Sequence, residues 1–248
     1  MKFGFIVATA VGLFISGAAS AAEIKVIASG ATKEIINEIL PTFEKNSGHK
    51  VAIEFTGTAN IKKRIAAGET YDLVIVGAPE IDAFAQQGKI ASGTRTDLMK
   101  SGVGVAVRSG ASKPDIGSSE ALKKTLLAAK SIGYSSGPSG DHMVNLVERM
   151  GIADQVKPKM KQVPSGSRIS TMIESGEAEI GFQQISELIH ENGIDYIGPL
   201  PSEVQKITVY AAGLHTGARE PEAAKALVKA LAAPDAATLV KAHGMVPG

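Results

Sequence analysis

The sequence contains no cysteine and no tryptophan, and only 4% of its 248 residues are aromatic. The lack of cysteine excludes disulfide bonds, thiolate metal ligands and cysteine nucleophiles. So few aromatic rings do not favour a site that stacks on sugars or bases. Stability must therefore come from a hydrophobic core, which a chain of this length is large enough to form.

The chain also lacks an excess of charge of either sign, with a formal net charge of +1 at pH 7. No basic stripe is present, so nucleic acid is not expected as a partner. The histidines show no metal-ligand spacing, and neither a P-loop nor a G-x-S-x-G nucleophile elbow occurs. We therefore expect no metal ion and no cofactor.

A long apolar run occurs only in the first segment. There, Lys2 precedes an apolar run from Phe3 to Ile15, and small residues follow up to Ala21. This is the pattern of a signal peptide with an A-x-A cleavage site. The run is shorter than the about 20 residues that a membrane-spanning helix needs. We expect removal of a signal peptide at residues 1–21 and export of a soluble protein to the periplasm.

Beyond residue 21, short apolar segments alternate with amphipathic helical patterns. The predicted strands are 23–29, 50–55, 71–76, 102–107, 130–135, 179–184 and 206–214. This alternation predicts an α/β fold of two lobes, each a mixed, mostly parallel sheet flanked by helices, with a ligand cleft between them. Because the strand at 206–214 can return to the first unit, lobe 1 is predicted to be 22–102 plus 207–248, and lobe 2 to be 103–206.

Ligands of open α/β sheets bind beyond the carboxyl ends of the strands. Turns at 29–32, 56–60, 135–142 and 184–187 follow predicted strands, and a helix start near 165–170 is a fifth candidate. Most of them carry Ser, Thr or Gly at helix starts, where unpaired N–H groups and the helix dipole attract anions. The same residues are ordinary caps and turn formers, so only their number and shared position predict an anion-binding cleft.

Three segments resemble a known family in both order and spacing. They are "FEKNSGHKVAIEFTGTANIKKRIAAGETYDLVIVGAPEIDAFAQQGKI" (43–90), "GPSGDHMVNLVERMGI" (137–152) and "IESGEAEIGFQQISEL" (173–188). The chain is similar to type II periplasmic solute-binding proteins of the group that includes the molybdate-binding protein of ABC importers. The resemblance covers nearly all of the mature chain. It implies a two-lobed fold, a small anionic ligand and an ABC permease of the inner membrane as partner; we also expect a monomer.

The turns and this resemblance together give a set of candidate ligand-binding residues. They are Ser29, Gly30, Thr32, Thr58, Ala59, Ser139, Gly140, Ser167, Arg168 and Gln184. The sequence departs from the family's pattern, with Gly30 where a ligand serine is usual, Gln184 in place of a tyrosine, and Glu187 in place of the following acid. With the guanidinium of Arg168 added, these changes favour a larger organic anion over bare molybdate or tungstate.

Three functions remain open at this point. The favoured interpretation is a periplasmic substrate-binding protein of an ABC-type importer, which captures a small anion: either an oxyanion such as molybdate, or an organic di- or tricarboxylate. The alternative is an isomerase of an unsaturated tricarboxylate, similar to aconitate isomerase, in which His142 or a nearby acid serves as the base. A sensor subunit that presents its ligand to a membrane receptor is the third.

Overall fold

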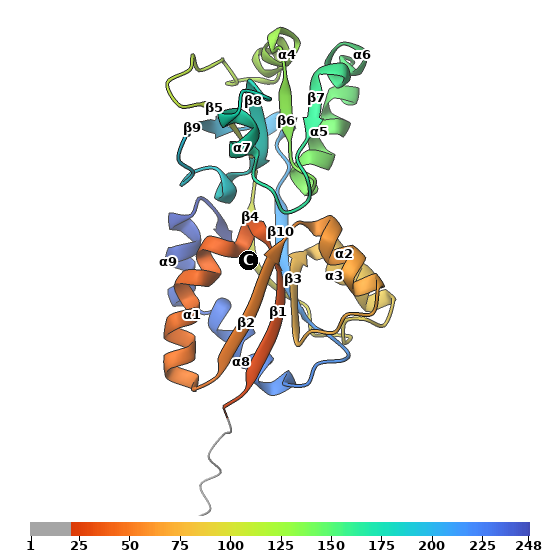
Figure 1. Ribbon diagram of the computed structural model, residues 1–248, viewed down its shortest axis with the longest axis vertical. Helices are drawn as coiled ribbons and strands as arrows, with labels where there is room; N and C mark the ends of the chain where they lie inside the picture. Colours follow the sequence, from red (N-terminus) through yellow and green to blue (C-terminus); the bar gives the residue numbers. More distant parts are fainter. Residues whose placement is uncertain (1–20) are drawn as a thin grey trace, which may run out of the picture.

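The computed structural model describes residues 21–248, so nearly all of the predicted signal peptide lies outside the described residues. Two sheets form two lobes stacked along the long axis of the molecule (Figure 1). One sheet has the order β11 (Val246–Pro247), β4 (Thr96–Ser101), β10 (Thr208–Leu214), β3 (Leu73–Gly77), β1 (Glu23–Ser29), β2 (Lys50–Thr56). The other has the order β7 (Met160–Gln162), β6 (Ile132–Tyr134), β8 (Ile180–Gln184), β5 (Val103–Arg108), β9 (Ile194–Pro199).

Both sheets are mixed, as the sequence predicts. In lobe 1, β1 is parallel to β2 and β3, whereas β10 lies antiparallel between β3 and β4. In lobe 2, β6 is parallel to β7 and β8, whereas β5 lies antiparallel between β8 and β9. Residues 22–102 and 207–248 contain all the strands of the six-stranded sheet, and residues 103–206 contain all those of the five-stranded sheet.

Helices cover both faces of the six-stranded sheet. One face packs against α1 (Lys33–Ser47), α8 (Pro221–Leu231) and α9 (Pro234–Ala242), and the other against α2 (Thr58–Ala66) and α3 (Ala78–Gln86). In β3, Leu73 and Ile75 belong to the first core cluster, and Val74 and Val76 to the second. The continuous apolar run of this strand follows from burial on both sides. Figure 1 shows α1 and α2 on opposite sides of β1.

The five-stranded sheet is covered in the same way. Its helices are α4 (Ser119–Ala128), α5 (Pro138–Arg149), α6 (Ala153–Val156) and α7 (Ile169–Glu174). α4 and α5 pack on one face and α7 on the other. α7 approaches the sheet closely because Gly181 has no side chain: a Cβ there would lie 2.6 Å from Cγ1 of Ile169. This close approach fixes the turn that precedes α7. Within residues 21–248, no helix combines the length and the hydropathy needed to cross a membrane.

The chain passes between the lobes at two points. Gly102 alone separates β4 from β5, and η4 (Ser202–Val204) lies between β9 and β10. The side chain of Gln205 joins the two crossings, since its Oε1 accepts from the Val103 N–H at 2.8 Å and its Nε2 donates to the Val103 carbonyl at 3.0 Å. We predict a hinge at these crossings.

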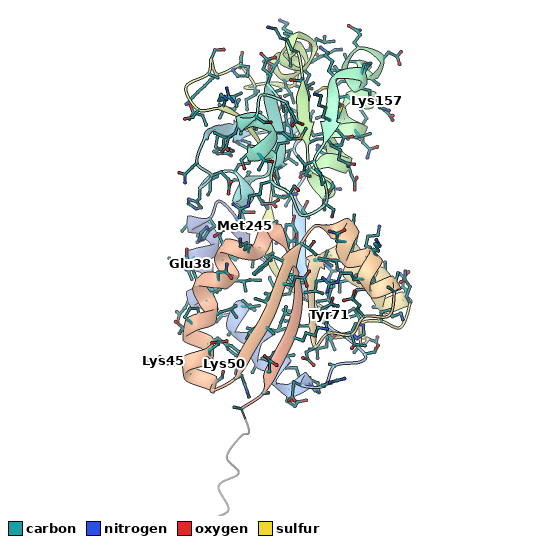
Figure 2. The ribbon with its side chains drawn as sticks, viewed as in Figure 1. Glu38, Lys45, Lys50, Tyr71, Lys157 and Met245 are labelled. Carbon is teal, nitrogen blue, oxygen red and sulfur yellow. The ribbon has the colours of Figure 1, made fainter. Side chains whose placement is uncertain are left out.

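Several exposed lysine side chains lie far from the junction of the lobes. Figure 2 shows Lys45 and Lys50 at the end of lobe 1 that is remote from lobe 2, and Lys157 on the outer part of lobe 2, whereas Met245 lies near the junction. Lys50 pairs with Glu44, and Lys157 with Glu148. Such exposed pairs contribute roughly 0–1 kcal/mol each. The junction itself is built from other contacts.

Candidate functional site

Turns from both lobes line a single cavity of about 130 Å³. Lobe 1 contributes the ends of β1 and β2 with the helix starts that follow them, and lobe 2 contributes the turns before α5 and α7 and the end of β8. The junctions predicted from the sequence therefore converge. At about 30 Å³ per water, a cavity of this volume has room for roughly four waters.

The helix starts of lobe 1 present backbone donors to this cavity. Ser29 precedes η1 (Gly30–Thr32), which runs directly into α1, and Gly57 precedes α2. Neither N-cap residue makes a side-chain cap hydrogen bond. Ser118 is different, since its hydroxyl accepts from the Ala121 N–H at 3.1 Å at the start of α4. At these two helix starts of lobe 1, no side chain of the N-cap residue occupies the backbone donors, which remain for a ligand.

The start of α5 supplies the facing wall from lobe 2. Its N-cap, Gly137, makes no side-chain cap hydrogen bond, and Pro138 has no N–H. The Ser139 hydroxyl lies 2.7 Å from the Ser135 hydroxyl, and the Gly140 N–H donates to that Ser135 oxygen at 3.0 Å. These bonds hold the turn in shape, and Thr58 of lobe 1 lies opposite Gly137.

Two cations line the cavity, and they differ in their partners. Arg168 donates to Glu34 of lobe 1 at 2.9 Å and also pairs with Glu191. Its guanidinium therefore ties the lobes together and is largely neutralised. Lys33 begins α1, and no carboxylate among residues 21–248 forms a salt bridge with it. A cation at a helix N-terminus opposes the helix dipole, so an anionic ligand would stabilise it.

An acid from lobe 2 completes the polar lining of the cavity. Glu187 ends η3 (Ile185–Glu187), directly after β8, and its carboxyl group faces the cavity. Burial raises the pKa of Glu187 to about 7, although a hydrogen bond from Gln183 and the charge of Arg168 act to lower it. Near neutral pH this group is therefore present in both its protonated and its ionised form.

Two more polar side chains complete the lining beside Glu187. Gln184 is buried, its Nε2 donates to Thr208 at 3.3 Å, and its Oε1 has no partner among the described residues. Burial is the main cause that raises the pKa of Tyr210 well above its usual value, so its hydroxyl stays protonated. The wall around Glu187 is thus neutral and rich in hydrogen-bonding groups.

The structure brings most of the predicted residues together. Ser29, Gly30, Thr58, Ser139, Ser167, Arg168 and Gln184 line the cavity. Three others do not, and each has a physical reason. Thr32 is buried and its hydroxyl donates back to the Ser29 carbonyl at 2.8 Å, Ala59 is exposed on α2, and Gly140 is enclosed by its own turn.

His142 also lies away from the cavity. Its Nε2 is 2.7 Å from the Val204 carbonyl oxygen, and its ring lines a separate groove of about 430 Å³. We call this the hinge groove; its lining includes Glu80, His142 and Lys206. The prediction of His142 as the base is therefore wrong on geometric grounds, and the acid in the cavity is Glu187.

Sequence reasoning missed Lys33, Tyr210 and the position of the Glu187 side chain. A cation placed directly after an anion-binding turn was a usable signal for Lys33. Tyr210 comes from a strand distant in sequence, and nothing local marks it. Among residues 21–248, no group of three or more His, Cys, Asp or Glu side chains could hold a metal ion.

Comparison with known proteins defines the class of the molecule. The chain belongs to the family described as bacterial extracellular solute-binding protein, whose pattern matches residues 24–246. Within that class it is a type II periplasmic binding protein similar to molybdate-binding proteins.

Individual relatives differ in what their names describe. An aconitate isomerase of Pseudomonas sp. is 35% identical over 228 residues, which cover 90% of this chain and 87% of that protein. The molybdate-binding protein ModA of Azotobacter vinelandii is 26% identical over 250 residues, covering 96% of this chain and 95% of that protein. The solved periplasmic molybdate-binding protein of A. vinelandii superposes with a TM-score of 0.76 at 19% identity, covering 91% of this chain and 99% of that one; this last likeness concerns the fold alone.

Proposed function

We propose that this protein closes its two lobes around a small organic polycarboxylate. The convergence of helix starts without side-chain caps, together with Lys33, on one cavity supports an anionic ligand. Each hydrogen bond from such donors to a carboxylate is worth about 1.5–3 kcal/mol. Several of them supply the about 8 kcal/mol of micromolar binding after ordering costs are met.

The composition of the cavity favours an organic anion over a bare oxyanion. Its volume in this structure is close to that of a small anion of about five or six heavy atoms, so a larger polycarboxylate would need the lobes to stand further apart. The ionised form of Glu187 would also repel a dianion that carries no proton. A polycarboxylate spreads its charge over separate groups, so one end can face Lys33 while a less charged part faces Glu187.

Thermal denaturation with a panel of anions tests this proposal. Citrate and cis- and trans-aconitate are compared with molybdate, tungstate, sulfate and phosphate. At about 100 times the Kd, a ligand stabilises the folded state by about 2.7 kcal/mol. This corresponds to a rise in Tm of about 5–10 °C for a chain of this size. Stabilisation by molybdate alone would overturn the choice of ligand, and stabilisation by none of the anions would overturn the anion site.

The membership of an extracellular solute-binding family supports a role in uptake. We propose that the protein acts in the periplasm and delivers its ligand to an ABC permease of the inner membrane. The matched experiment compares uptake of radiolabelled polycarboxylate by cells with and without the gene. Unchanged uptake would contradict the transport role and leave the binding site untouched.

A second candidate function is isomerisation of an unsaturated tricarboxylate on the same scaffold. Two observations favour it: the 35% identity to the Pseudomonas aconitate isomerase, and the carboxyl group of Glu187 inside the cavity. Incubation with cis- and trans-aconitate, followed by ultraviolet absorbance, separates the two roles. Turnover identifies an enzyme, whereas thermal stabilisation without turnover identifies a receptor.

A further inference from the structure

The cavity holds very few groups that can exchange a proton. Its titratable side chains are Lys33, Arg168, Glu187 and Tyr210. Arg168 is already paired with two carboxylates. Tyr210 keeps its proton because burial raises its pKa. Lysine and tyrosine therefore serve this cavity as donors, and Glu187 is the group that remains for accepting a proton.

The Glu187 carboxyl group is held against the first turn of lobe 1. A Cβ on Gly30 would lie 3.2 Å from its Oε1, so the absence of a side chain at that position gives the carboxyl group its place. The side-chain amide of Gln183 also holds this carboxyl group through a hydrogen bond. Its Oε1 accepts from the Ile169 N–H at 2.7 Å, which leaves its Nε2 for the hydrogen bond to Glu187. The Gln184 backbone also forms a hydrogen bond to the carboxyl group, which is thus held in place in the lining of the cavity.

We infer that Glu187 is the single acid–base group that moves a proton between two carbons of a bound unsaturated polycarboxylate. This inference rests on the isomerase candidate above. The ionised Glu187 removes a proton from the CH₂ group next to the double bond. The C–H electron pair spreads over the three-carbon unit and its attached carboxylate. The protonated Glu187 then returns the proton to the carbon at the other end of that unit, and the double bond moves by one position.

This step consumes nothing, since the proton that leaves one carbon is replaced at the other and no redox partner is needed. The added negative charge of the intermediate falls on carboxylate oxygens. The N–H groups at the start of α2 and the ammonium group of Lys33 are placed to stabilise that charge. A pKa of about 7 for Glu187 suits a group that must both take and give a proton near neutral pH.

The closing experiment uses the full chain and three readouts: thermal stabilisation by trans-aconitate, interconversion of cis- and trans-aconitate, and deuterium uptake at carbon in D₂O followed by NMR. We expect the wild-type protein to show all three. Glu187→Gln should keep the thermal stabilisation but lose turnover and deuterium uptake by about 10²–10⁴-fold. His142→Gln, which alters the hinge groove, should behave as the wild type in all three.

A second variant separates position from chemistry. Gly30→Ala keeps the carboxyl group but displaces it, so it should lower kcat with less effect on KM. Turnover retained in Glu187→Gln overturns this inference and leaves the isomerase intact. Binding by the wild type with neither turnover nor deuterium uptake overturns both the inference and the isomerase candidate, but not the polycarboxylate site. Loss of thermal stabilisation by every polycarboxylate overturns the proposed function itself.

Discussion

The cavity and the hinge groove share Pro138 at the start of α5, yet they differ in volume and in the turns that line them. The groove is larger, at about 430 Å³ against about 130 Å³. It mixes acids with bases, and its Arg95 is already paired with Asp82 at 2.6 Å. The cavity is smaller, but turns from both lobes converge on it, including Ser29 and Thr58 of lobe 1 and Ser139 of lobe 2. Convergent donors, and not volume, therefore mark the candidate site.

The largest expected effect concerns the turn at the start of α5, which lines the cavity and, through Pro138, the hinge groove. A Cβ on Gly140 would overlap the Ser135 carbonyl oxygen, whereas a Cβ on Gly137 would meet only the Thr58 hydroxyl at 3.7 Å. We expect Gly140→Ala to lose about 1–3 kcal/mol or more of folding free energy, and Gly137→Ala to lose little. Urea denaturation measures both. Equal stabilities would show that this turn does not fix the wall of the cavity.

The second comparison sets the acid of the cavity against the imidazole of the groove. Burial raises the pKa of Glu187 from 4.5 to about 7, so the folded state binds more protons than the unfolded state between these values. Wild-type stability should therefore fall as the pH rises through this range, by at most about 3 kcal/mol. Burial lowers the pKa of His142, so its contribution has the opposite sign and falls as the pH decreases below 6.5.

Glutamine variants of the two residues, measured by thermal denaturation over a range of pH, separate their opposite contributions to the pH dependence of stability. Relative to the wild type, Glu187→Gln should gain stability from about pH 5 to about pH 8. His142→Gln should gain it in the reverse direction, on top of a constant loss from the bond to Val204. A Glu187→Gln difference that does not vary with pH would mean that this carboxyl group is solvated like an ordinary surface acid.

The third comparison concerns two lysines, one in the cavity and one in the hinge groove. Lys33 lines the cavity and Lys206 lines the hinge groove. Because a charge-assisted hydrogen bond is worth about 1.5–3 kcal/mol, Lys33→Met should weaken polycarboxylate binding about 10- to 100-fold in calorimetry. Lys206→Met should leave the affinity nearly unchanged. An equal loss in both variants would point to long-range attraction and not to contact, and raised salt would then abolish it.

Much of this fold could be predicted from local pattern. The strand at 179–184 is found at Ile180–Gln184, and the one at 206–214 at Thr208–Leu214, because both carry apolar runs that are buried in the sheets. Four strands were missed: β4, β7, β9 and β11. β7 and β11 are three and two residues long, and β4 mixes charged with apolar residues, so only pairing with distant segments defines them.

The candidate site was predictable to the same degree and for the same reason. Turns at strand ends identify Ser29, Thr58 and Ser139, since their position follows from the topology alone. The orientation of a side chain does not follow from it. The Thr32 hydroxyl bonds to Ser29, three residues before it, whereas the Glu187 carboxyl group lies against Gly30, which is far away in sequence. The proposed function depends on these side-chain orientations, which the sequence pattern does not give.

The smallest expected effect separates a structural cap from a ligand donor. Ser118 bonds to the Ala121 N–H at the start of α4, so Ser118→Ala should cost about 1 kcal/mol of stability and leave ligand affinity unchanged. Ser29 makes no such bond and lines the cavity. Ser29→Ala should therefore cost less stability but weaken polycarboxylate binding measurably. If both variants lose stability alike and neither loses affinity, the start of α1 is an ordinary capped helix end, and the contrast between cavity and scaffold fails at that turn.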